Sequence, residues 1–204
     1  MFDLLLVMRA VHFGATLSVA GVVFFFAFVC EPAFRIVDES GPMPAIVRSH
    51  LARIAWISLA LVVATGAGWF ILQAEQMSEL SLDDVLSQGV AWSVLWETEF
   101  GNDWAVRFAL AVLLAGASYR VFSGAPLRSW GARAVIVALA ASLVGTLAFA
   151  GHAAAHSGTE GAIHLISDIL HLIAAAGWVG ALLPLAGNYS PRVRWSRAGC
   201  LGGG

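Results

Sequence analysis

The sequence predicts an all-α membrane protein, a polytopic bundle of about five transmembrane helices. Of its 204 residues, 59% are hydrophobic and only 12% are charged, whereas soluble domains carry about 25% charged residues. Mean hydropathy is +0.82, and the apolar segments are long enough for helices of about 20 residues to cross a bilayer. The composition therefore predicts contact with lipid, because too few charges are present to cover a water-facing surface.

Five apolar segments carry this prediction. They cover residues 3–29, 53–73, 104–122, 134–151 and 162–186. The first lacks a basic leader and a small-residue cleavage site before Glu31, so we expect a retained helix and not a signal peptide. The spans form one predicted transmembrane domain, 1–187. A basic cytoplasmic tail is predicted at 188–204, where WSRAGCLGGG resembles the start of an interrupted sixth span.

The connections between the spans differ in charge. Residues 74–103 hold seven acids and no base, whereas 120–133 and the tail hold arginines and no acid. Because Lys and Arg mark the cytoplasmic side, we predict an outside N-terminus and an inside C-terminus. The acidic connection repeats apolar residues at roughly helical spacing, and Trp92 and Trp96 suit the outer headgroup region.

Ionisable side chains are concentrated in GHAAAHSGTEGAIHLISDILH, which holds four of the six histidines. His164, Asp168 and His171 are spaced i, i+4 and i+7, so a helix places them in one stripe. Counting along the fifth span puts His171 close to the middle of the membrane. Arg9, His12 and Thr16 form the same kind of stripe in the first span, with Arg9 at the depth of Asp168 and His12 at that of His171.

Two pairings between these stripes are predicted. Charged groups cost about 2.5–3.5 kcal/mol each at the centre of a membrane helix, so they are expected to face the protein interior and to serve function. Arg9 and Asp168 would neutralise each other as a structural ion pair. His12 and His171 would converge on one metal ion or one haem iron, because imidazole is the commonest metal ligand. The alternative, that each histidine only hydrogen-bonds a neighbouring helix, stays open.

A second set of histidines is predicted at the outer surface. His152 and His156 are four residues apart at the end of the fourth span, and with His164 they would capture a metal ion. Imidazoles with a carboxylate suit Cu(II) or Zn(II). The alternative is a wetted loop that binds nothing. Arg107, a cation just inside the third span, is expected to snorkel to the interface, and the alternative is that it faces the central cavity.

A weak internal repeat appears when the sequence is shifted by 159 residues. The aligned pairs are Arg9 with Asp168, His12 with His171, Ala15 with Ala174, and Gly21 with Gly180. Parallel repeats need an even number of helices between their starts, and four fit here. The coincidence of the two histidines within the predicted spans makes the repeat worth testing against the structure.

The chain resembles the copper resistance protein D (CopD) family of bacterial inner-membrane proteins. Four stretches carry the resemblance, and together they cover most of residues 8–186. They read RAVHFGATLSVAGVVFF, TGAGWFILQAEQMS, LWETEFGNDWAVRF and GHAAAHSGTEGAIHLISDILHLIAAAGWVGALLPL. The last is similar to the family's Gly-His-Ala loop and to its Asp-x-x-His-x-x-Ala-Ala-x-x-Trp-x-Gly helix, and it is the most specific of the four.

The resemblance implies copper handling across the inner membrane, with copper supplied by a periplasmic copper-binding partner. On that basis His152, His156 and His164 would capture copper, and Asp168, His171 and His12 would pass it inward. Members of the family have about eight spans, so a chain with five is expected to be truncated or frameshifted, and the alternative is a shortened relative of the family.

Two other classes of function remain beside the copper hypothesis. One is a membrane haem-b redox protein with His12 and His171 as axial ligands, and the other is a helical partner subunit that binds no ligand. The sequence has no phosphate loop, nucleophile elbow or Cys-x-x-Cys, and no basic stripe suited to nucleic acid. It therefore predicts no enzymatic activity outside the haem alternative and no nucleic-acid partner.

Overall fold

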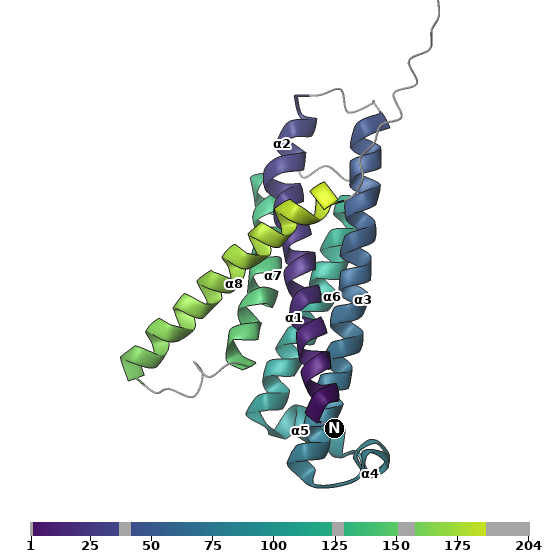
Figure 1. Cartoon of the computed structure of the whole chain (residues 1–204), viewed down its shortest axis with the longest axis vertical. Helices are drawn as coiled ribbons and strands as arrows, with labels where there is room; N and C mark the ends of the chain where they lie inside the picture. The colour runs from purple at the N-terminus through teal and green to yellow at the C-terminus, as the bar shows by residue number, and fades with distance from the viewer. Residues whose placement is uncertain (1, 37–41, 124–128, 151–157, 187–204) are drawn as a thin grey trace, which may run out of the picture.

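A bundle of helices makes up the residues described by the computed structural model, which are 2–36, 42–123, 129–150 and 158–186 (Figure 1). The elements are α1 (Phe2–Phe25), the π-helical η1 (Phe26–Cys30), α2 (Glu31–Phe34), α3 (Pro42–Ser78), α4 (Leu82–Ser87), α5 (Val90–Glu97), α6 (Glu99–Phe122), α7 (Trp130–Gly145), the 3₁₀ segment η2 (Thr146–Ala150) and α8 (Gly158–Ala186). Five helical segments are long and apolar enough to cross a membrane. The all-α, polytopic prediction is therefore confirmed.

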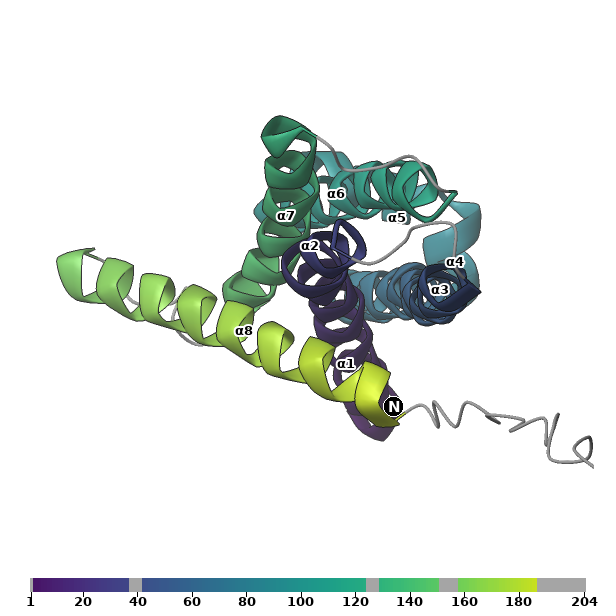
Figure 2. The ribbon, with the colours of Figure 1, turned by 90° about the horizontal axis from the view of Figure 1, so that it is seen from above.

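Helix α1 lies at the centre of the bundle, between α3, α7 and α8 (Figure 2). It continues through η1 and α2 as one apolar segment, Asp3–Phe34. Val19, Ala20 and Val22 are fully buried. A helix that is hydrophobic on all sides can be a membrane span or lie in the interior, and the packing of α3, α7 and α8 around α1 places it in the interior.

The acidic connection after α3 is helical, as its spacing predicted. Helix α4 is capped by Ser81, whose Oγ accepts a hydrogen bond from the Asp84 amide at 3.3 Å. Gly89 precedes α5 with a φ of 74°, a left-handed conformation that glycine adopts without strain. Thr98 caps α6 by accepting from the Gly101 amide at 2.9 Å, and these polar caps supply partners for amides that a helix start leaves free.

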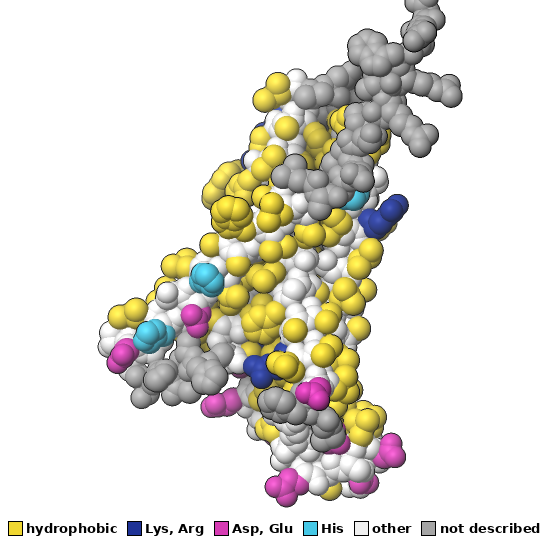
Figure 3. All heavy atoms as spheres, viewed as in Figure 1, with side chains coloured by type: hydrophobic (Ala, Val, Ile, Leu, Met, Phe, Trp, Pro, Cys, Tyr) yellow, Lys and Arg dark blue, Asp and Glu magenta, His cyan; other side chains and the backbone are white. Residues whose placement is uncertain are grey.

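The two ends of the bundle carry opposite charge. The end of α2, the start of α3, the end of α6 and the start of α7 lie together (Figure 1), and they bring Arg35, Arg48, Arg53, Arg120 and Arg133 to one end. Acidic side chains gather at the other end, around α4 and α5 (Figure 3). This is the asymmetry on which the predicted orientation, with the arginines in the cytoplasm, depends.

Helix α8 leans away from the other helices and touches them mainly near its C-terminal half (Figures 1 and 2). It crosses α1 where Gly21 meets Gly180. A Cβ atom at either glycine would collide with the backbone of the facing helix. In the most apolar 18-residue stretch of α8, only 11% is buried inside the protein. In the corresponding stretch of Asp3–Phe34, the segment that contains α1, 56% is buried. Most of α8 is therefore exposed.

Candidate functional site

His12 is buried in the bundle between α1 and α3. Its Nδ1 lies 3.1 Å from the Val62 carbonyl oxygen and 3.3 Å from Thr65 Oγ1. The Thr65 hydroxyl already donates its hydrogen to the Leu61 carbonyl at 2.5 Å, so both neighbours of Nδ1 can only accept. The hydrogen of the neutral ring therefore sits on Nδ1, and Nε2 carries a lone pair.

The second ring nitrogen of His12, Nε2, has no hydrogen-bond partner among the described residues. Nε2 is buried and makes no hydrogen bond to the residues that the structure describes, and the His12 side chain is about 1% exposed. Buried polar atoms are nearly always satisfied, so an orphan needs an explanation such as a missing ion or water. Metal-bound histidines characteristically donate their other N–H to a backbone carbonyl, as His12 does to Val62.

Two tryptophans surround His12. The Trp69 ring meets it edge-on at a centroid distance of 5.7 Å, and the Trp104 ring lies at 5.4 Å. Gly66 makes this approach possible, because a Cβ there would lie 3.0 Å from Trp104 Cζ3 and 3.2 Å from His12 Cε1. His12 is thus held in a close-packed aromatic shell, and a larger residue at position 66 would have to push these rings aside.

The same two tryptophans form one wall of a cavity of about 250 Å³ at the end of the bundle where α4 and α5 lie. Its lining comprises Arg9, Trp69, Gln73, Phe100, Asp103, Trp104, Arg107, Phe149 and Ala150. The residues come from α1, α3, α6 and η2. Trp69 and Trp104 touch both His12 and the cavity, so they connect the two features into one site.

Arg107 is buried and lines the cavity, so the expectation that it snorkels to the interface is wrong and the alternative, that it faces a cavity, is confirmed. Only about 3% of the residue is exposed. Nε donates to Thr146 Oγ1 at 3.1 Å and Nη2 donates to the Thr146 carbonyl at 2.7 Å. Its guanidinium carbon lies 4.5 Å from the centre of the Trp104 ring. The start of η2 supplies these acceptors, and they retain the cation inside the bundle.

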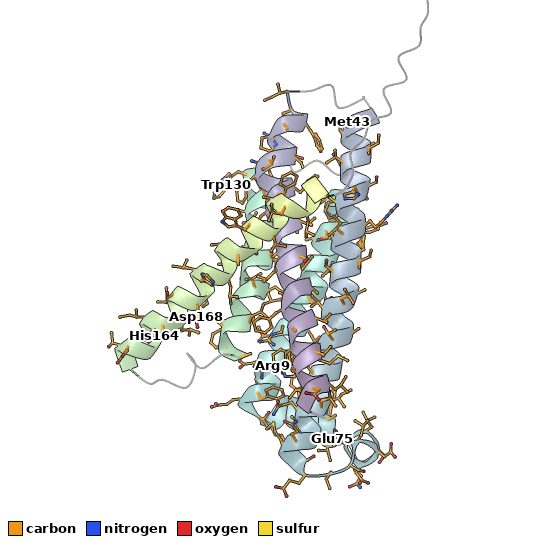
Figure 4. All side chains as sticks on the ribbon, in the orientation of Figure 1. Arg9, Met43, Glu75, Trp130, His164 and Asp168 are labelled. Atoms are coloured by element: carbon orange, nitrogen blue, oxygen red, sulfur yellow. The ribbon has the colours of Figure 1, made fainter. Side chains whose placement is uncertain are left out.

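Arg9 contacts the other end of the same 3₁₀ segment. Its Nη2 donates to the Ala150 carbonyl at 3.2 Å, and its guanidinium carbon lies 4.9 Å above the Trp69 ring. Asp168, its predicted partner, is exposed on α8 and lies away from Arg9 (Figure 4). The structure therefore does not join Arg9 to Asp168.

The predicted stripe on α8 is present, but it faces outward. His164, Asp168 and His171 are all exposed, and His164 Nε2 lies 3.9 Å from Glu160 Oε1 one turn earlier. His171 therefore does not share the buried environment of His12. Within the described ranges, no group of three or more His, Cys, Asp or Glu side chains is arranged to hold a metal ion. His152 and His156 lie outside the described residues.

Sequence reasoning missed most of the cavity wall. Two pairs of polar or amphipathic residues in apolar helices line the cavity, and the members of each pair are four residues apart. They are Trp69 with Gln73 on α3, and Asp103 with Arg107 on α6. Such spacing places each pair on one face, and this signal could have found the cavity.

The fold and the site define a class of protein, a polytopic helical membrane protein with ionisable side chains inside its spans. The chain belongs to the copper resistance protein D-like family, whose N-terminal domain matches residues 1–162. The chain is 25% identical over 183 residues to the "Inner membrane protein YebZ" of Escherichia coli (strain K12), covering 87% of this chain and 55% of the relative. It is 33% identical over 140 residues to the "Copper resistance protein D" of Pseudomonas syringae pv. tomato, covering 68% and 42%.

The chain thus spans about half the length of the curated relatives it matches. No solved structure matches it significantly. With five apolar helices and these relatives, the chain is a multi-pass inner-membrane protein.

Proposed function

We propose that the chain takes part in copper resistance by handling copper ions within the inner membrane. The observation that carries the proposal is the orphaned Nε2 of His12, a buried imidazole lone pair on a chain whose family is named for copper resistance. Neutral imidazole is a suitable ligand for copper. The backbone hydrogen bond to Val62 favours the tautomer that leaves Nε2 available.

The exposed stripe on α8 supports a second copper position. Asp168 and His171 lie in the middle of a helix apolar enough to span the membrane. Ionisable groups there are costly in lipid and characteristically face water, a partner or an ion pathway. We propose that His152, His156 and His164 capture copper on the outer side, and that Asp168, His171 and His12 pass it inward. A periplasmic copper-binding protein would deliver the ion.

Copper retention by the purified chain tests this proposal. The chain in mild detergent is expected to retain about one copper ion, and His12→Ala is expected to lower copper affinity by at least about tenfold, since loss of even an outer-shell partner costs about 10–100-fold. His171→Ala is expected to lower it in the same direction. Metal analysis after dialysis against a competing chelator measures the effect.

His50→Ala is the matched control, because His50 lies on α3 at the opposite, arginine-rich end of the bundle. Equal copper retention by the His12, His171 and His50 variants would contradict the proposed pathway. If His12→Ala and His171→Ala lowered copper retention and His156→Ala did not, the proposed capture of copper on the outer side would be wrong, and the inner part of the pathway would stand. The absorption spectrum of the same samples tests the haem alternative, to which the comparisons lend no support. A Soret band that is present in the wild-type chain and lost in His12→Ala would favour the haem hypothesis over the copper hypothesis.

A further inference from the structure

The cavity beside His12 holds more positive than negative charge. Two guanidinium groups, of Arg9 and Arg107, line it together with one carboxylate, that of Asp103. Both guanidiniums also lie over the same indole, since their central carbons are 4.9 Å and 5.8 Å from the centre of the Trp69 ring. Two like charges are therefore held on one aromatic ring, with a surplus of one positive charge (two minus one) in the lining.

Among the described residues neither guanidinium forms a salt bridge with a carboxylate, and Asp103 is the one acid in the cavity lining beside the two arginines. In the described part of the chain the ion pairs are those of Arg35 and His164, and neither involves the cavity. Arg107 and Arg9 bond instead to neutral acceptors, the hydroxyl and carbonyl of Thr146 and the carbonyl of Ala150. One carboxylate balances only one of the two cations, and a buried positive charge that is not balanced is unfavourable, because its loss of hydration is not offset.

Donors remain for a ligand. Each guanidinium has five N–H groups in a planar fork, and the hydrogen bonds to Thr146 and Ala150 use Nε and Nη2 of Arg107 and Nη2 of Arg9. Nη1 of both residues makes no hydrogen bond to a described residue, and the Gln73 amide lines the same space. This fork matches the two oxygens of a carboxylate or phosphate group.

We propose that this cavity binds a small oxyanion, of phosphate or carboxylate size, between Arg9 and Arg107. A volume of about 250 Å³ exceeds that of such a group with its water, since one water occupies about 30 Å³ in the liquid. The bound anion would neutralise the surplus charge and keep the two guanidiniums on Trp69. The oxyanion comes either from solution or from the headgroup of an anionic lipid.

Titration of the purified, copper-free chain in neutral detergent tests this site. Inorganic phosphate and acetate serve as the soluble probes, and phosphatidylglycerol in mixed micelles serves as the lipid probe. Binding is followed by calorimetry and by the fluorescence of Trp69 and Trp104, assigned with Trp69→Phe. We expect saturable binding that Arg107→Gln and Arg9→Gln each weaken by about tenfold or more, the usual size for a lost charge-assisted hydrogen bond.

Arg48→Gln is the matched control. Arg48 also stacks on aromatic rings, 5.7 Å from the centre of Phe26 and 6.0 Å from that of Phe34, but at the opposite end of the bundle. It should bind the probes like the wild-type chain. Arg107→Lys keeps the cation, so it should retain more binding than Arg107→Gln. Arg9→Gln, which removes a single hydrogen bond from a half-buried residue, decides the question if Arg107→Gln does not fold.

Two results would overturn the proposal. One is the absence of saturable binding of all three probes, and the other is equal binding by the Arg9, Arg107 and Arg48 variants. Saturation by phosphatidylglycerol alone would identify the source of the oxyanion as lipid, and saturation by phosphate or acetate would identify it as soluble. Because the titration contains no copper, its failure leaves the copper proposal standing, and failure of the copper proposal leaves this one standing.

Discussion

Gly180→Leu is expected to separate α8 from α1 and to destabilise the folded chain. A Cβ at residue 180 would collide with the backbone of Gly21, so one of the two helices has to shift and the contact between α1 and α8 is lost. Overpacking usually costs about 1–3 kcal/mol of folding free energy. Because the collision here is with backbone atoms, we expect a cost at or above the upper end of that range. A loss of about 3 kcal/mol corresponds to a fall of about 6–12 °C in the unfolding midpoint of a chain this size.

Thermal unfolding of the detergent-purified chain, followed by circular dichroism, measures this change. Gly177→Leu is the control on the same helix, because a Cβ at residue 177 meets no atom within 4 Å. Gly14→Leu is the corresponding control on α1, where the surroundings are equally open. If Gly180→Leu and Gly177→Leu unfolded at the same temperature, the crossing of α1 and α8 at Gly21 and Gly180 would be wrong.

The crossing also bears on the internal repeat. Gly21 and Gly180 are aligned by the shift of 159 residues, and they are the residues at which α1 and α8 meet. Small residues allow membrane helices to approach closely, and Ala176 one turn earlier extends the contact surface toward Gly21. The two aligned glycines thus face each other in the structure, and the repeat itself stays a prediction.

Trp104→Ala is expected to produce the second large loss of stability. Trp104 is about 1% exposed, and its ring lies within 6.5 Å of the rings of His12, Trp69, Phe70, Phe100 and Phe108. Removing a buried aromatic side chain costs about 3–5 kcal/mol. At about 2–4 °C per kcal/mol, the unfolding midpoint should fall by about 6–20 °C.

The matched control is Trp178→Ala on α8, where 72% of the tryptophan is exposed. That change should leave the midpoint of the detergent-solubilised chain nearly unaltered. Trp104→Ala should also free Arg107 from its stacking contact, so oxyanion binding should weaken together with stability. Unchanged stability and binding in Trp104→Ala would show that the aromatic shell does not support the site.

The number of spans and the polarity of the two ends could be predicted from the sequence. Both depend on local properties, because about 20 apolar residues are enough to form a membrane helix and the charges flanking it are adjacent in the chain. The stripe of His164, Asp168 and His171 was predictable for the same reason, since helical periodicity alone puts them on one face.

The direction in which each stripe points was decided only by tertiary packing. The equal depth predicted for Arg9 and Asp168 suggested that they would meet. Depth alone, however, does not determine how each helix is rotated about its axis, and so it does not determine where the side chains point. The close contact of Gly21 with Gly180 holds α8 at an angle that leaves its polar face exposed. Arg9 and Arg107 are 98 positions apart, and they meet over Trp69 because α1, α3 and α6 pack there. The sequence alone determined which residues are ionisable within the membrane, whereas packing between distant helices decided their neighbours, because those contacts depend on helix rotation and crossing angle.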